Sequence, residues 1–285
     1  MISIINPESI IEILCSNNFE HGQYLVSKQK PSSFGINLGR YLNYLDIKNR
    51  IYTLLGGFNG YKIRNLCKLE GIKLKYIFSD IENGELLNFS KEINFSYQSK
   101  IKILHEKYSQ KSINAFNYLV HQEKKEYAYY IFNTDSSQGF SLKNQIDLAK
   151  KIKQKFINSK IIIHIKSPEL DSLINQNFSD IFLLLISENE SLEEKNPPLF
   201  FEKIKRQNPK IPHILLIEQL KNLYLFTNQN QIHLTTIKLI TFEAILAGFI
   251  LGQKNQKDVL SSLNLGIDSQ KLILQNKKIN KNLLI

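Results

Sequence analysis

Short runs rich in β-branched residues or leucine recur along the chain. Polar and apolar residues do not alternate within them. The runs cover residues 51–55, 129–132, 160–165, 181–186 and 214–217. Such runs are typical of strands that are covered on both faces, as in the middle of a parallel sheet. The pattern therefore predicts a mostly parallel central sheet.

A helix is predicted between the second and third of these runs, where Ser141 can cap its start. Apolar residues recur there at spacings of three and four, which places one stripe against the sheet. They are Leu142, Ile146, Ala149, Ile152 and Phe156. A strand, a helix and a strand in this order predict a βαβ unit with a right-handed crossover.

Residues 87–97 follow a different pattern, because apolar and polar residues alternate there. The apolar positions are Leu87, Phe89, Ile93, Phe95 and Tyr97. Alternation of this kind is typical of a sheet with one face exposed to solvent. The sequence thus predicts an α/β protein, with a main sheet flanked by helices and a smaller sheet beside it.

Size and cysteine usage narrow the class of protein. The 285 residues, of which 42% are apolar, suffice for one large domain over 1–285. Cys15 and Cys67 lie far apart without metal-ligand spacing, so we expect two buried thiols and no metal site.

The chain lacks a signal-like start and any stretch of roughly 18 apolar residues, the length that spans a bilayer. We expect a cytoplasmic protein without membrane contact.

The formal net charge of +11 raises the question of an anionic partner. Most of the lysines are dispersed, and the densest runs, residues 150–155 and 277–278, carry no interleaved aromatic residues. Solvated helix faces therefore explain these runs better than a nucleic-acid patch does. A nucleic-acid-binding role rests on charge alone.

The chain carries its most informative motif at residues 239–249, which read LITFEAILAGF. This stretch resembles the catalytic helix of the ribokinase-like (PfkB) sugar kinases, which reads approximately GAGDSFVAGF. In that family the glycine N–H groups hold the transferred phosphate and the aspartate removes the proton of the substrate hydroxyl. The residues 247–249 are kept, whereas Ile240 and Phe242 replace the glycines and Glu243 takes the place of the aspartate.

Further segments resemble the same family in order, and 1-phosphofructokinase and tagatose-6-phosphate kinase in particular. They are ISIINP at 2–7, FEHGQ at 19–23, SSFGINLGR at 32–40, GGFNGYKI at 56–63 and EGI at 70–72. The resemblance implies a ribokinase-like fold whose small β lid is formed by residues 10–35 and 83–100. It also implies ATP and Mg²⁺ as cofactors of an active member.

The resemblance assigns roles to particular residues of this chain. Asn37 and Gly35 would bind the substrate, and Glu190 would lie near the nucleotide and Mg²⁺. Glu243 stands at the position of the catalytic base, and Thr241 could donate one hydrogen bond to an anion.

Several residues that bind the substrate or the nucleotide in an active family member are replaced in this chain. The aspartate that grips the sugar corresponds to Ile10, and the Gly-Gly-Lys of the sugar-binding loop corresponds to residues 32–34, which read SSF. Leu86 stands where an arginine binds the substrate phosphate, and residues 217–222 lack the glycines of the nucleotide-binding turn. Because Phe34, Leu86 and Phe242 replace two cations and a glycine, we expect a narrower and more apolar crevice.

Two functions follow as alternatives from this pattern. The first is a catalytically impaired pseudokinase with a binding or regulatory role, whose ligand is a hexose phosphate or a nucleotide. The second is a divergent 1-phosphofructokinase-type enzyme that transfers the γ-phosphate of ATP to a hexose phosphate, with Glu243 as base. The lid would serve in both cases as the interface of a homodimer.

Overall fold

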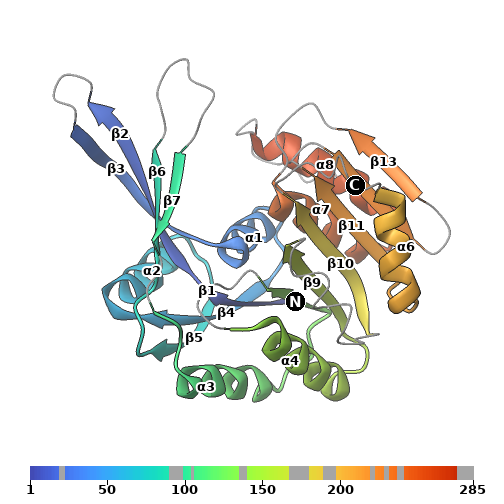
Figure 1. Cartoon of the computed structure of the whole chain (residues 1–285), viewed down its shortest axis with the longest axis horizontal. Coiled ribbons are helices and arrows are strands. Elements are labelled where there is room, and N and C mark those ends of the chain that lie inside the picture. The colour runs from blue at the N-terminus through green and yellow to red at the C-terminus, as the bar shows by residue number, and fades with distance from the viewer. Residues whose placement is uncertain are drawn as a thin grey trace.

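The computed structural model of the chain describes residues 1–18, 23–89, 99–103, 106–134, 140–166, 180–188, 197–218, 222–227, 231–235 and 241–274. Its main sheet has nine strands in the order β13-β12-β11-β10-β9-β8-β1-β4-β5 (Figure 1). These strands are β1 (Ile2–Glu8), β4 (Asn49–Gly56), β5 (Leu74–Ser79), β8 (Tyr129–Asn133), β9 (Lys160–Lys166), β10 (Ile181–Glu188), β11 (His213–Glu218), β12 (Asn222–Thr227) and β13 (Gln231–Thr235).

The sheet is mostly parallel, as its hydrophobic runs predict. Each of the five runs lies in a different strand, namely β4, β8, β9, β10 or β11, and these strands pair in parallel with their neighbours on the β1 side. β12 and β13 add an antiparallel hairpin at one edge. The prediction of a mostly parallel central sheet is therefore confirmed.

Helices cover both faces of the main sheet. One apolar cluster joins the sheet to α1 (Phe34–Tyr44), α2 (Gly57–Leu69), α7 (Phe242–Lys254) and α8 (Val259–Leu274). The other joins it to α3 (Gln110–His121), α4 (Leu142–Lys155) and α6 (Pro197–Gln207). Successive residues of β1 serve different clusters, since Ile4 belongs to the first and Ile5 to the second. This division follows from the alternation of side chains along a strand.

The predicted βαβ helix is α4, and its start has the expected cap. The Ser141 hydroxyl accepts a hydrogen bond from the Asn144 backbone N–H at 3.2 Å. Leu142, Ile146 and Ile152 are buried against the sheet. Local cap chemistry and an apolar stripe therefore suffice to place this helix.

A second sheet projects from one end of the main sheet (Figure 1). Its strands lie in the order β3-β2-β6-β7 and are β2 (Ile10–Asn18), β3 (Gln23–Ser32), β6 (Glu85–Phe89) and β7 (Ser99–Ile103). An ion pair of 2.6 Å joins Lys102 of β7 to the buried carboxylate of Glu8, which ends β1. The alternating positions Ile93, Phe95 and Tyr97 lie outside the described residues.

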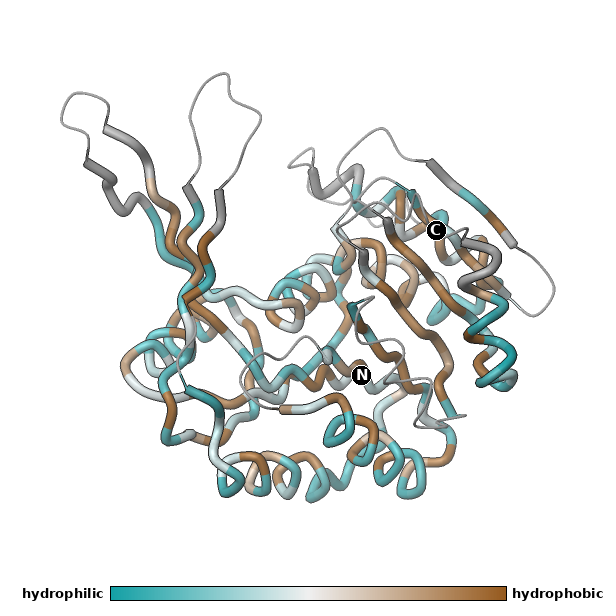
Figure 2. Tube along the Cα trace, viewed as in Figure 1, coloured by the Kyte–Doolittle hydropathy of each residue, from teal (hydrophilic) through white to brown (hydrophobic). Residues whose placement is uncertain are grey.

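Apolar residues concentrate in the strands of the main sheet, while the helices mix polar and apolar positions (Figure 2). Both cysteines are free and buried, as predicted, and burial raises the pKa of the Cys67 thiol to about 12. Among the described residues, no helix is both long enough and apolar enough to cross a membrane.

Candidate functional site

A chain of buried polar side chains crosses the carboxyl edge of the main sheet. The His164 ring binds Asn133 Oδ1 through Nδ1 at 2.8 Å and Ser187 Oγ through Nε2 at 3.1 Å. Asn133 Nδ2 in turn donates to Asn6 Oδ1 at 3.1 Å. The four residues come from the neighbouring strands β10, β9, β8 and β1. Open α/β sheets bind their ligands beside this edge, so the chain forms the floor of the candidate site.

The same chain continues into the start of α1. Asn6 Nδ2 donates to Ser33 Oγ at 3.0 Å, and Asn6 Oδ1 accepts from the Gly35 N–H at 3.1 Å. A Cβ atom on Gly35 would lie 2.5 Å from the Asn6 Cβ. Gly35 is therefore required by the close approach of α1 to the first strand, whatever its role toward a ligand.

Two aromatic rings lie against this floor. Phe34 stacks on His164 with a centroid distance of 4.5 Å and an angle of 14°, and Phe242 lies 5.8 Å from the same ring. Phe34 opens α1 and Phe242 opens α7, so both rings stand at helix N-termini. Each of these helix N-termini thus carries an apolar ring, and at α1 the N–H groups of Gly35 and Ile36 are already bound by Asn6 and Ser33.

The fold brings together two predicted site residues that are far apart in the sequence. Asn37 of α1 donates through Nδ2 to Glu243 Oε1 of α7 at 3.3 Å. Arg40 donates through Nη1 to Asn37 Oδ1 at 2.7 Å. Its guanidinium also binds Glu70 at 2.5 Å. Arg40 therefore fixes the amide orientation of Asn37, so that the amide N–H faces the Glu243 carboxylate.

Thr241 precedes α7 as its N-cap residue but makes no side-chain cap bond. Its backbone N–H donates to Gln270 Oε1 of α8 at 3.3 Å. Burial and the nearby Glu243 carboxylate raise the pKa of Tyr41, although a hydrogen bond with the Thr241 side chain opposes them. Thr241, Tyr41 and Glu243 therefore form one polar group beside the aromatic rings.

A polar cavity of about 650 Å³ lies beside this group. Its walls come from β3, α1 and the end of α2, with Lys28, Lys30, Asn37, Arg40, Tyr41, Asn43, Tyr44 and Glu70. Lys30 pairs with Glu12 at 3.2 Å, and Arg40 pairs with Glu70. Three cations and one carboxylate line the wall, and the ion pairs with Glu12 and Glu70 reduce this excess to one positive charge, a small preference for an anionic ligand.

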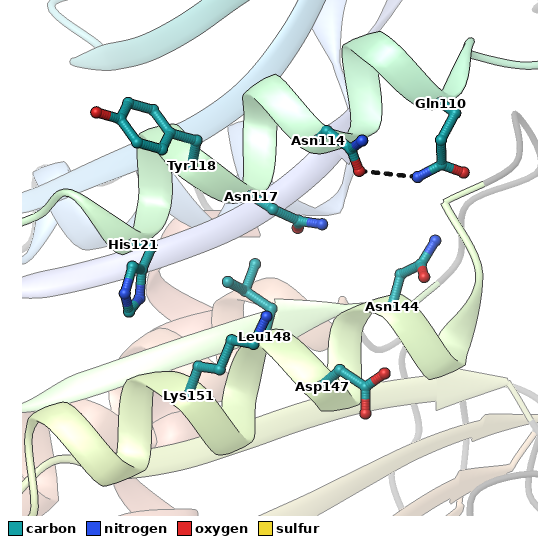
Figure 3. Close-up of a pocket in the computed structure, with 9 residues that line it drawn as sticks. All are labelled: Gln110, Asn114, Asn117, Tyr118, His121, Asn144, Asp147, Leu148 and Lys151. Carbon is teal, nitrogen blue, oxygen red and sulfur yellow. Dashed lines mark hydrogen bonds between the residues drawn. The ribbon is translucent and has the colours of Figure 1, made fainter.

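A second cavity, of about 600 Å³, lies between α3 and α4 (Figure 3). Asn117 and Asn144 point into it from opposite helices, and Leu148 forms part of its wall. These helices cover the face of the sheet opposite to α1 and α7. This cavity is therefore separate from the candidate site.

Other predicted site residues have different outcomes. Glu190 lies outside the described residues. Leu86 is half-buried in β6 and pairs across the sheet with Lys102 of β7. Among the described residues, no group of three or more histidine, cysteine and acidic side chains could hold a metal ion.

His164 lies in β9 without a catalytic or metal-binding spacing to other histidines, so its sequence context alone favours an ordinary packing role. The structure places it under both aromatic rings, with hydrogen bonds on both ring nitrogens. Only the register of β8, β9 and β10 brings its partners beside it. No local signal in the sequence could have found this centre.

The fold defines the chain as a ribokinase-like α/β protein that shares its architecture with sugar kinases. A possible 1-phosphofructokinase from Thermotoga maritima matches with a TM-score of 0.78 and 12% identity, covering 93% of this chain and 89% of that one. The tetrameric inhibited form of phosphofructokinase-2 from Escherichia coli matches with a TM-score of 0.77 and 11% identity, covering 97% and 94%.

A carbohydrate kinase from Agrobacterium tumefaciens has the same fold, with a TM-score of 0.67 and 10% identity over 99% of this chain and 95% of that one. No protein-family model matches the chain, and no curated protein matches it in sequence. The likeness to the PfkB-type phosphofructokinases is thus one of fold.

Proposed function

We propose that this chain is a pseudokinase: a protein with the fold of a phosphosugar kinase that binds a ligand in the inherited crevice without ordinary kinase activity. The observation that carries the proposal is the aromatic cluster on the carboxyl edge of the sheet, in which Phe34 stacks on His164 and the Phe242 ring is tilted against it. The ligand is a hexose phosphate or a nucleotide. The neighbouring phosphofructokinase-2 has been crystallised with fructose 6-phosphate, which makes a hexose phosphate a natural first probe.

The described residues do not fit a transferring phosphate at the start of α7. Phe242 is the first residue of this helix, and its ring lies beside His164. The ring occupies space next to the N–H groups that a phosphate would need, and it offers no hydrogen bond in their place. Loss of one donor to developing charge typically lowers a rate by about 10²–10³-fold.

ATP and Mg²⁺ are cofactors of this protein only if it is active. In the described part of the chain, the residues near the crevice lack a cluster of acidic ligands for Mg²⁺. Glu243, which holds the position of the base, accepts a hydrogen bond from Asn37. Because the Phe242 ring stands at the start of α7 and the described part of the chain lacks a cluster of acidic Mg²⁺ ligands, we assign Glu243 and Asn37 to ligand binding and not to phosphoryl transfer.

The alternative function is a divergent kinase that transfers the γ-phosphate of ATP to a hexose phosphate. The contact between Asn37 and Glu243 favours it, because a sugar hydroxyl bound by Asn37 would lie close to a carboxylate. A glutamate in place of an aspartate shifts that carboxylate by about a bond length, and a misplacement of roughly 1 Å can lower a rate about 10²-fold.

We propose further that two copies associate through the second sheet. On β7, the apolar residues Ile101 and Ile103 are 52% and 39% exposed. They lie opposite Leu87 and Glu85 of β6. A half-exposed apolar row on a sheet is typical of an interface. Sedimentation of the protein and of Ile101→Asp should distinguish a dimer from a monomer.

Calorimetry with separate and combined ligands tests the proposed function. Titrations use fructose 1-phosphate, fructose 6-phosphate, ATP with Mg²⁺, and ADP. We expect one class of ligand to bind and to raise the melting temperature by mass action. Phe34→Lys should alter this binding, whereas Ile157→Ser, a change at an exposed residue after α4, should not.

Micromolar binding of ATP with Mg²⁺ and a hexose phosphate together would contradict the pseudokinase and support the alternative enzyme. Binding of neither class would contradict both. Salt-sensitive retention of an oligonucleotide would replace them with the role that rests on charge.

A further inference from the structure

One edge of the main sheet ends in an open strand. Among the described residues, β5 pairs only with β4, and no strand lies on its other side. The Ile51 N–H donates to the Lys73 carbonyl at 3.0 Å. Because backbone groups alternate in direction along a parallel ladder, those of Leu74, Tyr76 and Phe78 point away from β4. These three residues therefore offer donors and acceptors to a further strand.

Exposed aromatic side chains line the same edge. Phe58 and Tyr61 of α2 are 74% and 54% exposed, and Phe78 of β5 is 41% exposed. Tyr61 lies 4.7 Å from Phe78, and Tyr76 lies 5.3 Å from Phe78, between ring centroids. Hydrogen-bonding groups of the backbone and a row of rings thus meet on one surface, which we call the β5 edge surface (Phe58, Tyr61, Tyr76 and Phe78).

The charge around the β5 edge surface is positive on balance. Residues 57–82 contain five cations, Lys62, Arg64, Lys68, Lys73 and Lys75, and three carboxylates, Glu70, Asp80 and Glu82. Glu70 is already paired with Arg40, and Lys75 with Glu123. Lys62 lies 5.7 Å from the Phe58 ring centre and Arg64 lies 5.8 Å from the Tyr76 ring centre, so cations stand beside the rings. A partner that covers these rings must tolerate or neutralise positive charge.

We propose that the β5 edge surface is a docking site for an acidic, extended segment of a partner protein, which adds to the sheet as a strand beside β5. Its backbone pairs with the outward groups of Leu74, Tyr76 and Phe78. Its apolar side chains cover the exposed rings, and its acidic side chains face the surrounding cations. Strand addition of this kind takes affinity from main-chain bonds and specificity from alternate side chains.

A second copy of this chain fits the surface less well. Two β5 edges placed together would bring the same cations face to face, and lysines near an edge strand discourage such pairing. Single-stranded nucleic acid could stack on the rings, but it would leave the backbone groups of β5 unpaired. The open edge therefore favours a peptide strand.

Selection from peptide libraries tests this proposal on the whole chain. One library displays nine-residue peptides with acidic residues at alternate positions and apolar residues between them, and a matched library carries lysine instead. We expect enrichment from the acidic library alone. The enriched peptides should bind Phe78→Glu at least about tenfold more weakly, as expected for loss of an anchor residue. Ile157→Ser serves as the control and should bind as the unmodified protein does.

Hydrogen exchange supplies a second measurement that does not depend on a variant. In the complex, the amides of Leu74, Tyr76 and Phe78 should exchange more slowly than in the free protein. The amides of Lys75 and Ile77, which face β4, should change little. This alternation is specific to strand addition.

Three results would overturn the proposal. The first is absence of enrichment, or enriched peptides that bind Phe78→Glu as well as the unmodified protein. The second is slow exchange at Tyr76 in the free protein together with a dimer in sedimentation, which would assign the edge to a second copy. The third is oligonucleotide binding that Phe78→Glu abolishes, without peptide binding.

Discussion

The two halves of α7 differ in what surrounds them. Its body is buried against α8: a Cβ on Gly248 would lie 2.6 Å from the Gly266 Cα, and one on Gly252 would lie 2.6 Å from the Ser262 Cα. Its first turn, with Phe242 and Glu243, is half-buried and faces the crevice. The motif that resembles the sugar kinases is kept in the body and replaced in the first turn.

The comparison shows that packing constrains the two halves of α7 to different degrees. In the body, neighbouring backbone leaves no room for a side chain, so glycine is required for packing. In the first turn, the half-buried side chains of Phe242 and Glu243 contact His164 and Asn37 at the margin of the core. Packing therefore restricts the residue type more strictly in the body of α7 than in its first turn.

The largest effect is expected in the body of α7. Gly248→Val adds a branched side chain where backbone atoms of α8 already lie within contact distance, and we expect the free energy of unfolding to fall by about 3 kcal/mol. Urea denaturation measures this. Gly71→Ala is the control, because Gly71 has a positive φ of 71° but no atom within 4 Å of the added Cβ. A loss for Gly248→Val no larger than for Gly71→Ala would contradict the close packing.

A smaller effect on stability is expected at His164, which contacts the first turn of α7. His164→Ala removes partners from Asn133 and Ser187 and leaves the aromatic rings unsupported. Leaving buried polar groups unpaired costs about 1–3 kcal/mol, and we expect about 2 kcal/mol in the same denaturation experiment. His213→Leu should cost less, because His213 Nδ1 has no hydrogen-bond partner to lose. Equal losses would mean that the polar chain adds no stability.

Glu123, at the start of the loop after α3, provides a third comparison, away from both halves of α7. Burial opposes ionisation of Glu123, but hydrogen bonds from Tyr52, the Lys125 N–H and Lys75 outweigh it and lower the pKa to about 2 from its ordinary value of 4.5. A depressed pKa stabilises the folded state above pH 4.5, and that stability is lost as the pH falls from 4.5 toward 2.

We expect this loss to be about 2 kcal/mol, which urea unfolding at pH 5 and pH 3 would measure. Other carboxylates also titrate in this range, so the comparison is with Glu123→Gln. That variant should be less stable at pH 5 and should lose less on acidification. An identical acid sensitivity of the two proteins would show that the Glu123 cluster is not responsible.

Packing was the part of this molecule that the sequence could predict. The apolar runs predicted the parallel strands. Ser141 and the apolar stripe that follows it predicted α4. The hairpin of β12 and β13 was missed, because residues 217–222 were interpreted through a nucleotide-binding turn that they do not resemble closely. In the structure, Ile217 and Glu218 end β11 and Asn222 begins β12.

The candidate site was only partly predictable for a physical reason. Asn37 and Glu243 were predicted because each lies in a segment that resembles a known motif, and the fold brings the two side chains into contact. His164, Asn133 and Ser187 belong to separate strands and meet through strand register. Lys102 and Glu8 meet only because the second sheet folds back on β1. Such contacts are a property of the fold and leave no local pattern.

The smallest effect on stability is expected in the first turn of α7. Glu243→Gln keeps an oxygen that can accept from Asn37 and removes a charge from a half-buried site. We expect a change below about 1 kcal/mol in urea denaturation, the usual size for a single hydrogen bond. A loss comparable with that of Gly248→Val would show that the first turn is as constrained as the body.

Phosphoryl transfer tests the central claim most directly. The measurement is the rate at which the unmodified protein and Glu243→Asp transfer phosphate from ATP, with Mg²⁺, to fructose 1-phosphate. Restoring the aspartate can raise the rate at most by the contribution of a general base, which is about 10²–10⁴-fold. It leaves the Phe242 ring beside His164 and provides no arginine at Leu86. We predict that neither protein approaches 1 s⁻¹, the lower end of typical turnover numbers. A rate of about 1 s⁻¹ or more in either protein would contradict the pseudokinase and establish the divergent enzyme in its place.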